Sequence, residues 1–223
     1  NGCAAICWKS AVPQAISAAV CQFDDLGAAT HAVIAAMQHG IPVARIELLD
    51  ALQMRACILY SKLEGFAEKP TLFFEFHGTE AGVTEQAGLM QQITADHGGS
   101  DFRWATRPED RSRLWKARHN AYYAALALAP GKQAFSTDAC VPISRLADCL
   151  LETCEDVARE GMIAPIVGHV GDGNFHLLVL FDPASAAERA KDEAIAHRVS
   201  LRAIGMGGTC TGEHGIGVHK LDA

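Results

Sequence analysis

The stretch of residues 168–176, Gly-His-Val-Gly-Asp-Gly-Asn-Phe-His, constrains the fold more than any other part of the chain. Its centre, Gly-Asp-Gly-Asn, has the composition of a turn that reverses a strand at little steric cost. Residues 163–170 before it and 175–181 after it are rich in apolar and β-branched side chains, which predicts two strands. The resulting hairpin would place His169 and His176 on facing strands near the turn, within reach of one ion.

A second cluster, Gly-Glu-His-Gly at residues 212–215, supplies a carboxylate, Glu213, and a third imidazole, His214. Two histidines and one carboxylate are the usual minimum for a divalent metal that keeps open positions. An ion bound by His169, His176 and Glu213 would polarise a substrate oxygen, and His214 could then take a proton from a hydroxyl. The alternative is that the histidines are structural and the glycines only form turns, which leaves the neighbouring ionisable side chains unexplained.

Two further residues are candidates for such a site, and each has a simpler interpretation. Arg118, on a predicted helix, is suited to a bidentate grip on a substrate carboxylate. Its alternative is a solvated helix face shared with Arg107, Arg111 and Arg113. Asp172 could orient a metal ligand from behind, but a role as an Asx-turn residue in the hairpin fits it better.

Composition excludes several classes of partner. The net charge is −7 with no basic run to neutralise phosphates, which argues against nucleic acid. No apolar run approaches the ~18 residues of a membrane span, and the start lacks the pattern of a signal peptide. Eight cysteines without a Cys-x-x-Cys pair indicate reduced thiols and a cytoplasmic compartment. The chain begins without Met and stops soon after its second glycine-rich motif, so we expect a piece of a longer polypeptide.

Hydrophobic periodicity and capping residues predict the order of elements. In the first half, strands alternate with helices over residues 15–23, 25–38, 43–49, 50–60, 71–76, 79–97 and 101–106. This order is the ferredoxin-like split pattern. The second half adds a helix over 108–129, a strand over 134–141, a helix over 144–160, the hairpin, and a helix over 184–206. We therefore predict an α+β fold, a ferredoxin-like antiparallel sheet with helices packed on one face plus a helical extension.

Residues 168–176 and the segment Gly-Thr-Cys-Thr-Gly-Glu-His-Gly-Ile-Gly (208–217) resemble the C-terminal domain of FAD-linked oxidases. The branch contains cytochrome-type D-lactate dehydrogenase, the glycolate oxidase flavin subunit and D-2-hydroxyglutarate dehydrogenase, and the resemblance is closest to the D-lactate dehydrogenase members. Further matching segments are residues 42–50, 70–78, 111–127 and 135–146. The resemblance covers nearly the whole chain, so residues 1–223 are expected to form the substrate- and metal-side domain that follows an FAD-binding domain.

The resemblance implies an enzyme that oxidises a D-2-hydroxy acid to a 2-oxo acid and passes hydride to FAD. By motif match, His169, His176 and Glu213 would bind the metal, with zinc or manganese expected. His214 would be the base beside the flavin, and Arg118 would hold the substrate carboxylate. FAD would be bound mainly by a domain absent from this chain, at residues the sequence does not identify, so the fragment alone is expected to be inactive.

The substrate and the electron acceptor are less constrained. The hydroxyglutarate branch typically has Asn and Lys where this chain has Leu178 and Ser136, which favours a small monoacid such as D-lactate. A glycolate oxidase-type subunit is the alternative within the family. The acceptor could be a quinone, a cytochrome or an electron-transfer flavoprotein, and the location cytoplasmic or peripheral to the inner membrane. Two alternatives of another class are a metal-dependent hydrolase, which needs no flavin domain, and a non-catalytic ferredoxin-like ligand-binding module, whose histidines would hold no metal.

Overall fold

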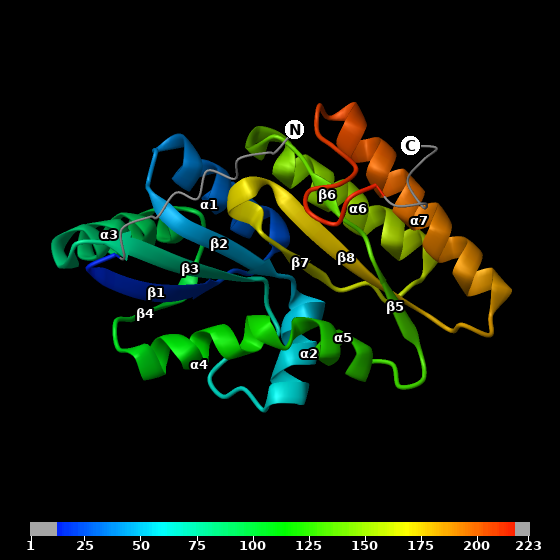
Figure 1. Ribbon diagram of the computed structural model, residues 1–223, viewed down its shortest axis with the longest axis horizontal. Helices are drawn as coiled ribbons and strands as arrows, with labels where there is room; N and C mark the ends of the chain where they lie inside the picture. The colour runs from blue at the N-terminus through cyan, green and yellow to red at the C-terminus, as the bar shows by residue number, and fades with distance from the viewer. Residues whose placement is uncertain (1–12, 217–223) are drawn as a thin grey trace, which may run out of the picture.

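A computed structural model describes residues 13–216, and eight strands of this part form one sheet of order β4-β1-β3-β2-β7-β8-β5, with β6 paired to β8 (Figure 1). The strands are β1 (Ala15–Gln22), β2 (Val43–Leu49), β3 (Thr71–Gly78), β4 (Ser100–Ala105), β5 (Gln133–Ser136), β6 (Ala139–Cys140), β7 (Ile166–Gly168) and β8 (Asn174–Phe181). All their pairings are antiparallel. The predicted α+β class with an antiparallel sheet is confirmed.

Helices cover both faces of this sheet (Figure 1). One face carries α1 (Leu26–Gln38), α3 (Glu80–Asp96), α6 (Leu146–Glu160) and α7 (Ala186–Gly205), and the other carries α2 (Ala51–Ser61), α4 (Pro108–His119) and α5 (Ala121–Ala127). Strand β3 shows why, because Leu72 and Phe74 enter one core cluster while Phe73 enters the other. Packing on one face, as predicted, holds for α1 and α3, but the short helix α2 packs on the opposite face together with α4 and α5.

Local sequence signals locate most helix starts. Asp25, Asp50 and Thr79 each accept a hydrogen bond from the backbone amide three residues later, as expected for N-caps. The helix predicted over 144–160 implies an N-cap at Ser144, and this is wrong, because Ser144 lies in the 3₁₀ turn η1 (Ile143–Arg145). Helix α6 begins at Leu146, with Arg145 at its N-cap and no side-chain capping bond.

Two predicted elements are divided in the structure. The helix expected over 108–129 breaks at Asn120, whose side-chain amide donates to a serine hydroxyl at the end of α2. Helix α5 then packs on α2, so tertiary contacts override the continuous helical pattern. The strand expected over 134–141 is split into β5 and β6 by Thr137 and Asp138, two buried polar residues.

The predicted hairpin is confirmed, since β7 and β8 pair with Val167 opposite His176. Its turn is a short 3₁₀ helix, η2 (Val170–Asp172), followed by Gly173 at φ 76°. On its other side, β7 pairs with β2 through two register partners only, and this short pairing joins the N-terminal strands β1–β4 to the C-terminal strands. His169 lies one residue past the end of β7, at this junction.

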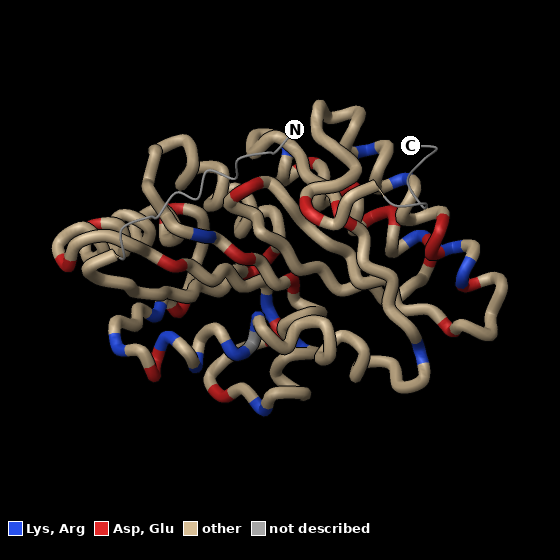
Figure 2. Tube along the Cα trace, viewed as in Figure 1, with Lys and Arg blue, Asp and Glu red and all other residues tan. Residues whose placement is uncertain are grey.

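Charges and thiols are spread over the described part of the chain. Figure 2 shows Lys and Arg mixed with Asp and Glu on several elements. No helix among residues 13–216 is long and apolar enough to cross a membrane. Four cysteines of this part are free thiols, namely Cys21, Cys140, Cys149 and Cys154. Cys3, Cys7 and the last residue of the 208–217 motif lie outside the described residues.

Candidate metal and substrate site

The structure brings His169, His176 and Glu213 together at the β7–β8 hairpin. Glu213 comes from the loop after α7, and its Oε1 lies 3.0 Å from Nε2 of His176 and 3.6 Å from Nε2 of His169. One ligand atom from each residue lies within 4.8 Å of the other two. This spacing suits a single ion coordinated by two imidazoles and one carboxylate.

Hydrogen bonds fix which ring nitrogen each imidazole presents. Nδ1 of His169 lies 2.7 Å from Oε1 of Glu47, and Nδ1 of His176 lies 2.9 Å from the backbone carbonyl of Thr137. Both partners accept, so the neutral tautomer of each ring carries its proton on Nδ1. The lone pairs on Nε2 then point toward Glu213. A buried acceptor behind a metal-binding histidine is the usual second half of such a site, so the donor set fits a divalent ion.

Glu47, on β2, is a site residue that the sequence reasoning missed. Its side chain is only 3% exposed, and its two oxygens accept from His169 and from Nε of Arg118, the latter at 2.8 Å. The available signal was an acidic residue between the apolar residues Ile46 and Leu48 of a strand. Such a residue needs partners, because an unpaired buried carboxylate is costly.

Burial and pairing shift the pKa values around this carboxylate. Burial alone would raise the pKa of Glu47, but the hydrogen bond with His169 and the charge of Arg118 outweigh it and hold the pKa below its usual range. The same hydrogen bond raises the pKa of His169. Burial lowers the pKa of His176, which favours the neutral imidazole that a metal requires.

His214 lies directly beside the three candidate ligands. Its ring stacks on that of His176 with centroids 4.9 Å apart, and its Nε2 lies 3.7 Å from Oε1 of Glu213. The His214 side chain is 46% exposed, in contrast to His176. An imidazole placed in this way can contact a ligand bound at the site and can also exchange protons with solvent.

Asp138, between β5 and β6, anchors the loop that carries Glu213 and His214, and the sequence reasoning missed it as well. Its Oδ2 accepts hydrogen bonds from the hydroxyl of Thr211 and from the amides of Gly212, Glu213 and His214, at 2.8 to 2.9 Å. Burial opposes the charge on Asp138, but these bonds hold its pKa well below the usual range. The signal was the pair of polar residues that interrupts an apolar strand.

Arg118 contacts the candidate site through Glu47 and does not lie on a solvated helix face. It lies in the last turn of α4, and its side chain is 21% exposed because it reaches Glu47 on β2. Three residues earlier on α4, the ring of Trp115 lies under the guanidinium of Arg45. Cζ of Arg45 is 3.8 Å from the centroid of that ring. Arg107 fits the solvated interpretation, since it is exposed and pairs with a neighbour on its own helix. Asp172 lies in η2, and its carboxylate makes no hydrogen bond to the His-His-Glu group within the described residues.

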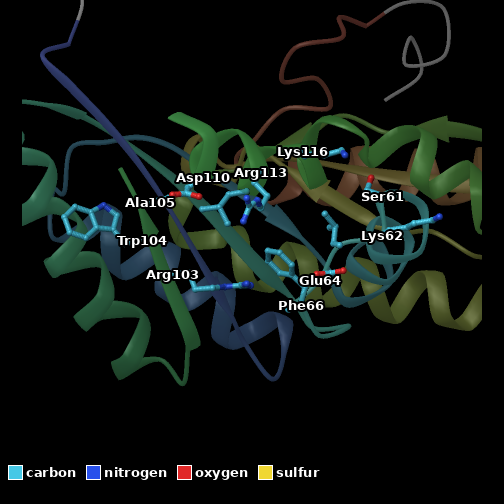
Figure 3. A pocket seen from close by; sticks show the side chains of 13 residues that line it. Ser61, Lys62, Glu64, Phe66, Arg103, Trp104, Ala105, Asp110, Arg113 and Lys116 are labelled. Atoms are coloured by element: carbon cyan, nitrogen blue, oxygen red, sulfur yellow. The ribbon is translucent and has the colours of Figure 1, made fainter. Parts of the chain in front are cut away.

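A cavity of about 770 Å³ lies elsewhere, between the segment that follows α2, strand β4 and helix α4 (Figure 3). Its lining includes four cations and two carboxylates, namely Lys62, Arg103, Arg113, Lys116, Glu64 and Asp110. The Arg103 guanidinium lies 4.0 Å from the centroid of the Phe66 ring, which fixes one wall. The residues lining this cavity do not include any of the five predicted site residues.

Residues 12–223 match the family described as FAD linked oxidases, C-terminal domain. The chain therefore belongs to this family, and the resemblance drawn from its motifs is confirmed. The probable mitochondrial D-lactate dehydrogenase of Danio rerio is 49% identical over 94% of this chain and 42% of that protein. The mitochondrial D-lactate dehydrogenase (cytochrome) of Arabidopsis thaliana is 43% identical over 94% and 37%, and the glycolate oxidase subunit GlcD of Escherichia coli is 30% identical over 90% and 40%.

The chain thus spans less than half the length of these curated relatives. Solved structures share its fold at low sequence identity. The 4-ethylphenol oxidase from Gulosibacter chungangensis matches with a TM-score of 0.65 at 14% identity, over 90% of this chain and 46% of that one. An alkyldihydroxyacetonephosphate synthase matches with a TM-score of 0.60 at 13% identity, over 90% and 41%. At these identities the likeness supports the fold alone.

Proposed function

We propose that this chain is the substrate- and metal-side domain of an FAD- and metal-dependent D-2-hydroxy-acid dehydrogenase that oxidises D-lactate to pyruvate. The observation that carries the proposal is the convergence of His169, His176 and Glu213, with His214 stacked beside them. Membership of the FAD-linked oxidase family supports the flavin, and the two D-lactate dehydrogenase relatives support the substrate. Family membership also disfavours a hydrolase or a non-catalytic module.

Each residue has a role that its surroundings support. His169, His176 and Glu213 hold zinc or manganese, since imidazole and carboxylate donors suit both ions. Such an ion, when bound, would supply Lewis-acid chemistry at the substrate hydroxyl, and FAD would supply the hydride acceptor. Arg118 binds the substrate carboxylate through its terminal nitrogens, because its Nε is already bonded to Glu47. His214 removes the hydroxyl proton, since imidazole exchanges protons near neutral pH.

A small monoacid is supported by two residues next to the site. Leu178 follows His176 by two positions on β8, so both side chains face the same side of the sheet. Ser136 on β5 is the register partner of Leu178. A buried leucine opposite a small hydroxyl offers no cation for a second carboxylate, which favours D-lactate over a diacid. The higher identity to D-lactate dehydrogenases than to the glycolate oxidase subunit points the same way.

The names of the relatives also bear on acceptor and location. The Arabidopsis thaliana relative is called a cytochrome-type enzyme, so we favour a cytochrome over a quinone or an electron-transfer flavoprotein. Both D-lactate dehydrogenase relatives are called mitochondrial, which favours a mitochondrial location over the cytoplasmic one predicted from the thiols.

The test compares the full-length wild-type protein with His176→Ala, and uses His197→Ala on α7 as a matched control outside the site. We expect His176→Ala to lose bound metal and D-lactate turnover with a dye acceptor, while flavin absorbance is retained. Removing the metal from wild type with a chelator should abolish turnover, and zinc or manganese should restore it. Unchanged metal content and turnover in His176→Ala would show that the paired histidines are structural.

A further inference from the structure

We propose that Glu47 is a positioning residue that couples the two halves of the site by holding the substrate-binding arginine and a metal-binding histidine on one carboxylate. This inference deepens the proposed function and rests on it. Glu47 touches neither substrate nor metal in this arrangement. It acts through Arg118 and His169, which lie 71 and 122 positions away in the sequence.

The two carboxylate oxygens of Glu47 bind different partners, which is the main observation behind this inference. Oε1 lies 2.7 Å from Nδ1 of His169, and Oε2 lies 2.8 Å from Nε of Arg118. Each oxygen therefore serves one partner, and both partners are donors. The bond to His169 directs its Nε2 toward Glu213, while the bond to Arg118 leaves the terminal guanidinium nitrogens for a substrate carboxylate.

The strand and the helix that carry these groups are aligned at two points. Arg45 and Glu47 alternate on β2 and so face the same side of the sheet. Trp115 and Arg118 are one helical turn apart on α4, and they meet Arg45 and Glu47 respectively. The contact between Arg45 and Trp115 thus fixes the position of α4 along β2. In that position, the hydrogen bond to Glu47 orients the Arg118 side chain. Because two separate contacts align α4 with β2, the ion pair of Glu47 and Arg118 is held in a defined geometry.

A carboxylate is required because an amide cannot serve both partners. In Glu47→Gln the side chain keeps its size, but one of its two terminal atoms becomes a donor. Whichever way the amide turns, either His169 or Arg118 faces a donor and loses its hydrogen bond. The partly buried Arg118 also loses its counter-charge. Glu47→Asp keeps the charge, but it is shorter by one methylene group and cannot span both partners.

The strand next to β2 offers a matched control. Glu75 on β3 likewise joins an arginine to a histidine, with 2.8 Å contacts to Arg45 and to His77. It contacts neither Arg118 nor His169 among the described residues. Glu75→Gln removes a similar charge but keeps an amide oxygen that can accept from Arg45, so the contact of Arg45 with Trp115 is retained and neither Arg118 nor His169 loses a partner.

The experiment measures zinc and manganese affinity of the full-length protein by competition with a chromophoric chelator, and separately KM and kcat for D-lactate. We expect Glu47→Gln to weaken metal affinity by about 10- to 100-fold, the usual effect of losing a partner behind a metal ligand. KM for D-lactate should rise in the same variant. Glu47→Asp should show both effects and so covers the case in which Glu47→Gln does not fold, while Glu75→Gln should show neither.

The outcomes separate this inference from the proposed function. Metal affinity and KM within twofold of wild type in a folded Glu47→Gln protein would overturn the inference, even if wild type binds metal and oxidises D-lactate. A change in only one of the two quantities would overturn the coupling. A wild-type protein that binds no stoichiometric metal and does not oxidise D-lactate would instead refute the proposed function, and this inference with it.

Discussion

Hydrogen bonds to Asp138 hold the loop that carries Glu213 and His214, so a substitution of Asp138 tests how strongly this loop is anchored. In Asp138→Asn, the side chain keeps its shape and can still present one oxygen to the loop, but the negative charge is lost. A hydrogen bond to a charged group contributes about 1 kcal/mol more than one to a neutral group. Four donors meet Oδ2, so the sum is about 4 kcal/mol. Because the energies of hydrogen bonds to one atom are not additive, we expect the loop to lose about half of this sum in stability, ~2 kcal/mol.

Hydrogen exchange of the full-length protein measures this loss directly. The amides of Gly212, Glu213 and His214 donate to Asp138, so their protection should fall by about 30-fold, the equivalent of ~2 kcal/mol. Metal affinity should fall as well, because Glu213 is no longer held. A matched control is Asp25→Asn, which alters an N-cap carboxylate on α1 far from this loop in the sequence.

The acid dependence gives a second readout with a definite sign. The folded-state pKa of Asp138 is lowered, so its ionised form contributes stability above the unfolded value of about 3.9. That contribution is lost as the pH falls below this value. The difference between wild type and Asp138→Asn should therefore be full at pH 7 and shrink at pH 3. Equal protection of the loop amides in both proteins at pH 7 would refute the anchoring argument.

Two further predictions concern stability. Burial raises the pKa of Asp192 to about 6, and its Oδ1 has no hydrogen-bond partner among residues 13–216, so its ionisation costs stability as the pH rises from about 4 to above 6. Asp192→Asn should gain ~2 kcal/mol at pH 8 and nothing at pH 4 in denaturant titrations, and an equal gain at both would contradict this. A Cβ on Gly168 would lie 2.7 Å from the carbonyl oxygen of Asn174, so Gly168→Ala should lose about 1–3 kcal/mol. Gly88→Ala on α3, where the space is open, should gain up to ~1 kcal/mol, and the same thermal shift in both variants would argue against close packing at the hairpin.

The parts of the fold that follow local rules were predictable from the sequence. The hairpin around His169 and His176 is specified by turn residues between two apolar runs, and the N-caps Asp25, Asp50 and Thr79 act on their own helices. The three candidate ligands were also identifiable, because histidines and carboxylates beside glycines have little reason to exist as packing.

The parts that depend on distant contacts were not predictable in this way. Nothing near Glu47 in the sequence reveals that its partners lie 71 and 122 positions away. Asp138 likewise meets its donors only when α7 returns the chain to β6, through the bridge between Cys140 and Thr209. The break at Asn120 has the same origin, because packing of α5 on α2 decides it rather than helix propensity.

The short pairing of β2 with β7 has a consequence for how the domain assembles. Glu47 and Arg118 belong to one side of this junction, and all three candidate metal ligands belong to the other. Joining Glu47 to His169 closes a loop of about 120 residues, at an entropic cost of about 4 kcal/mol. Because contacts of such high sequence separation are formed only after the loop is closed, neither half of the chain can fold into the site by itself. If Arg118 binds the substrate and His169 binds the metal, as proposed above, a bound substrate would connect the two sides of the junction and should slow unfolding of the whole sheet.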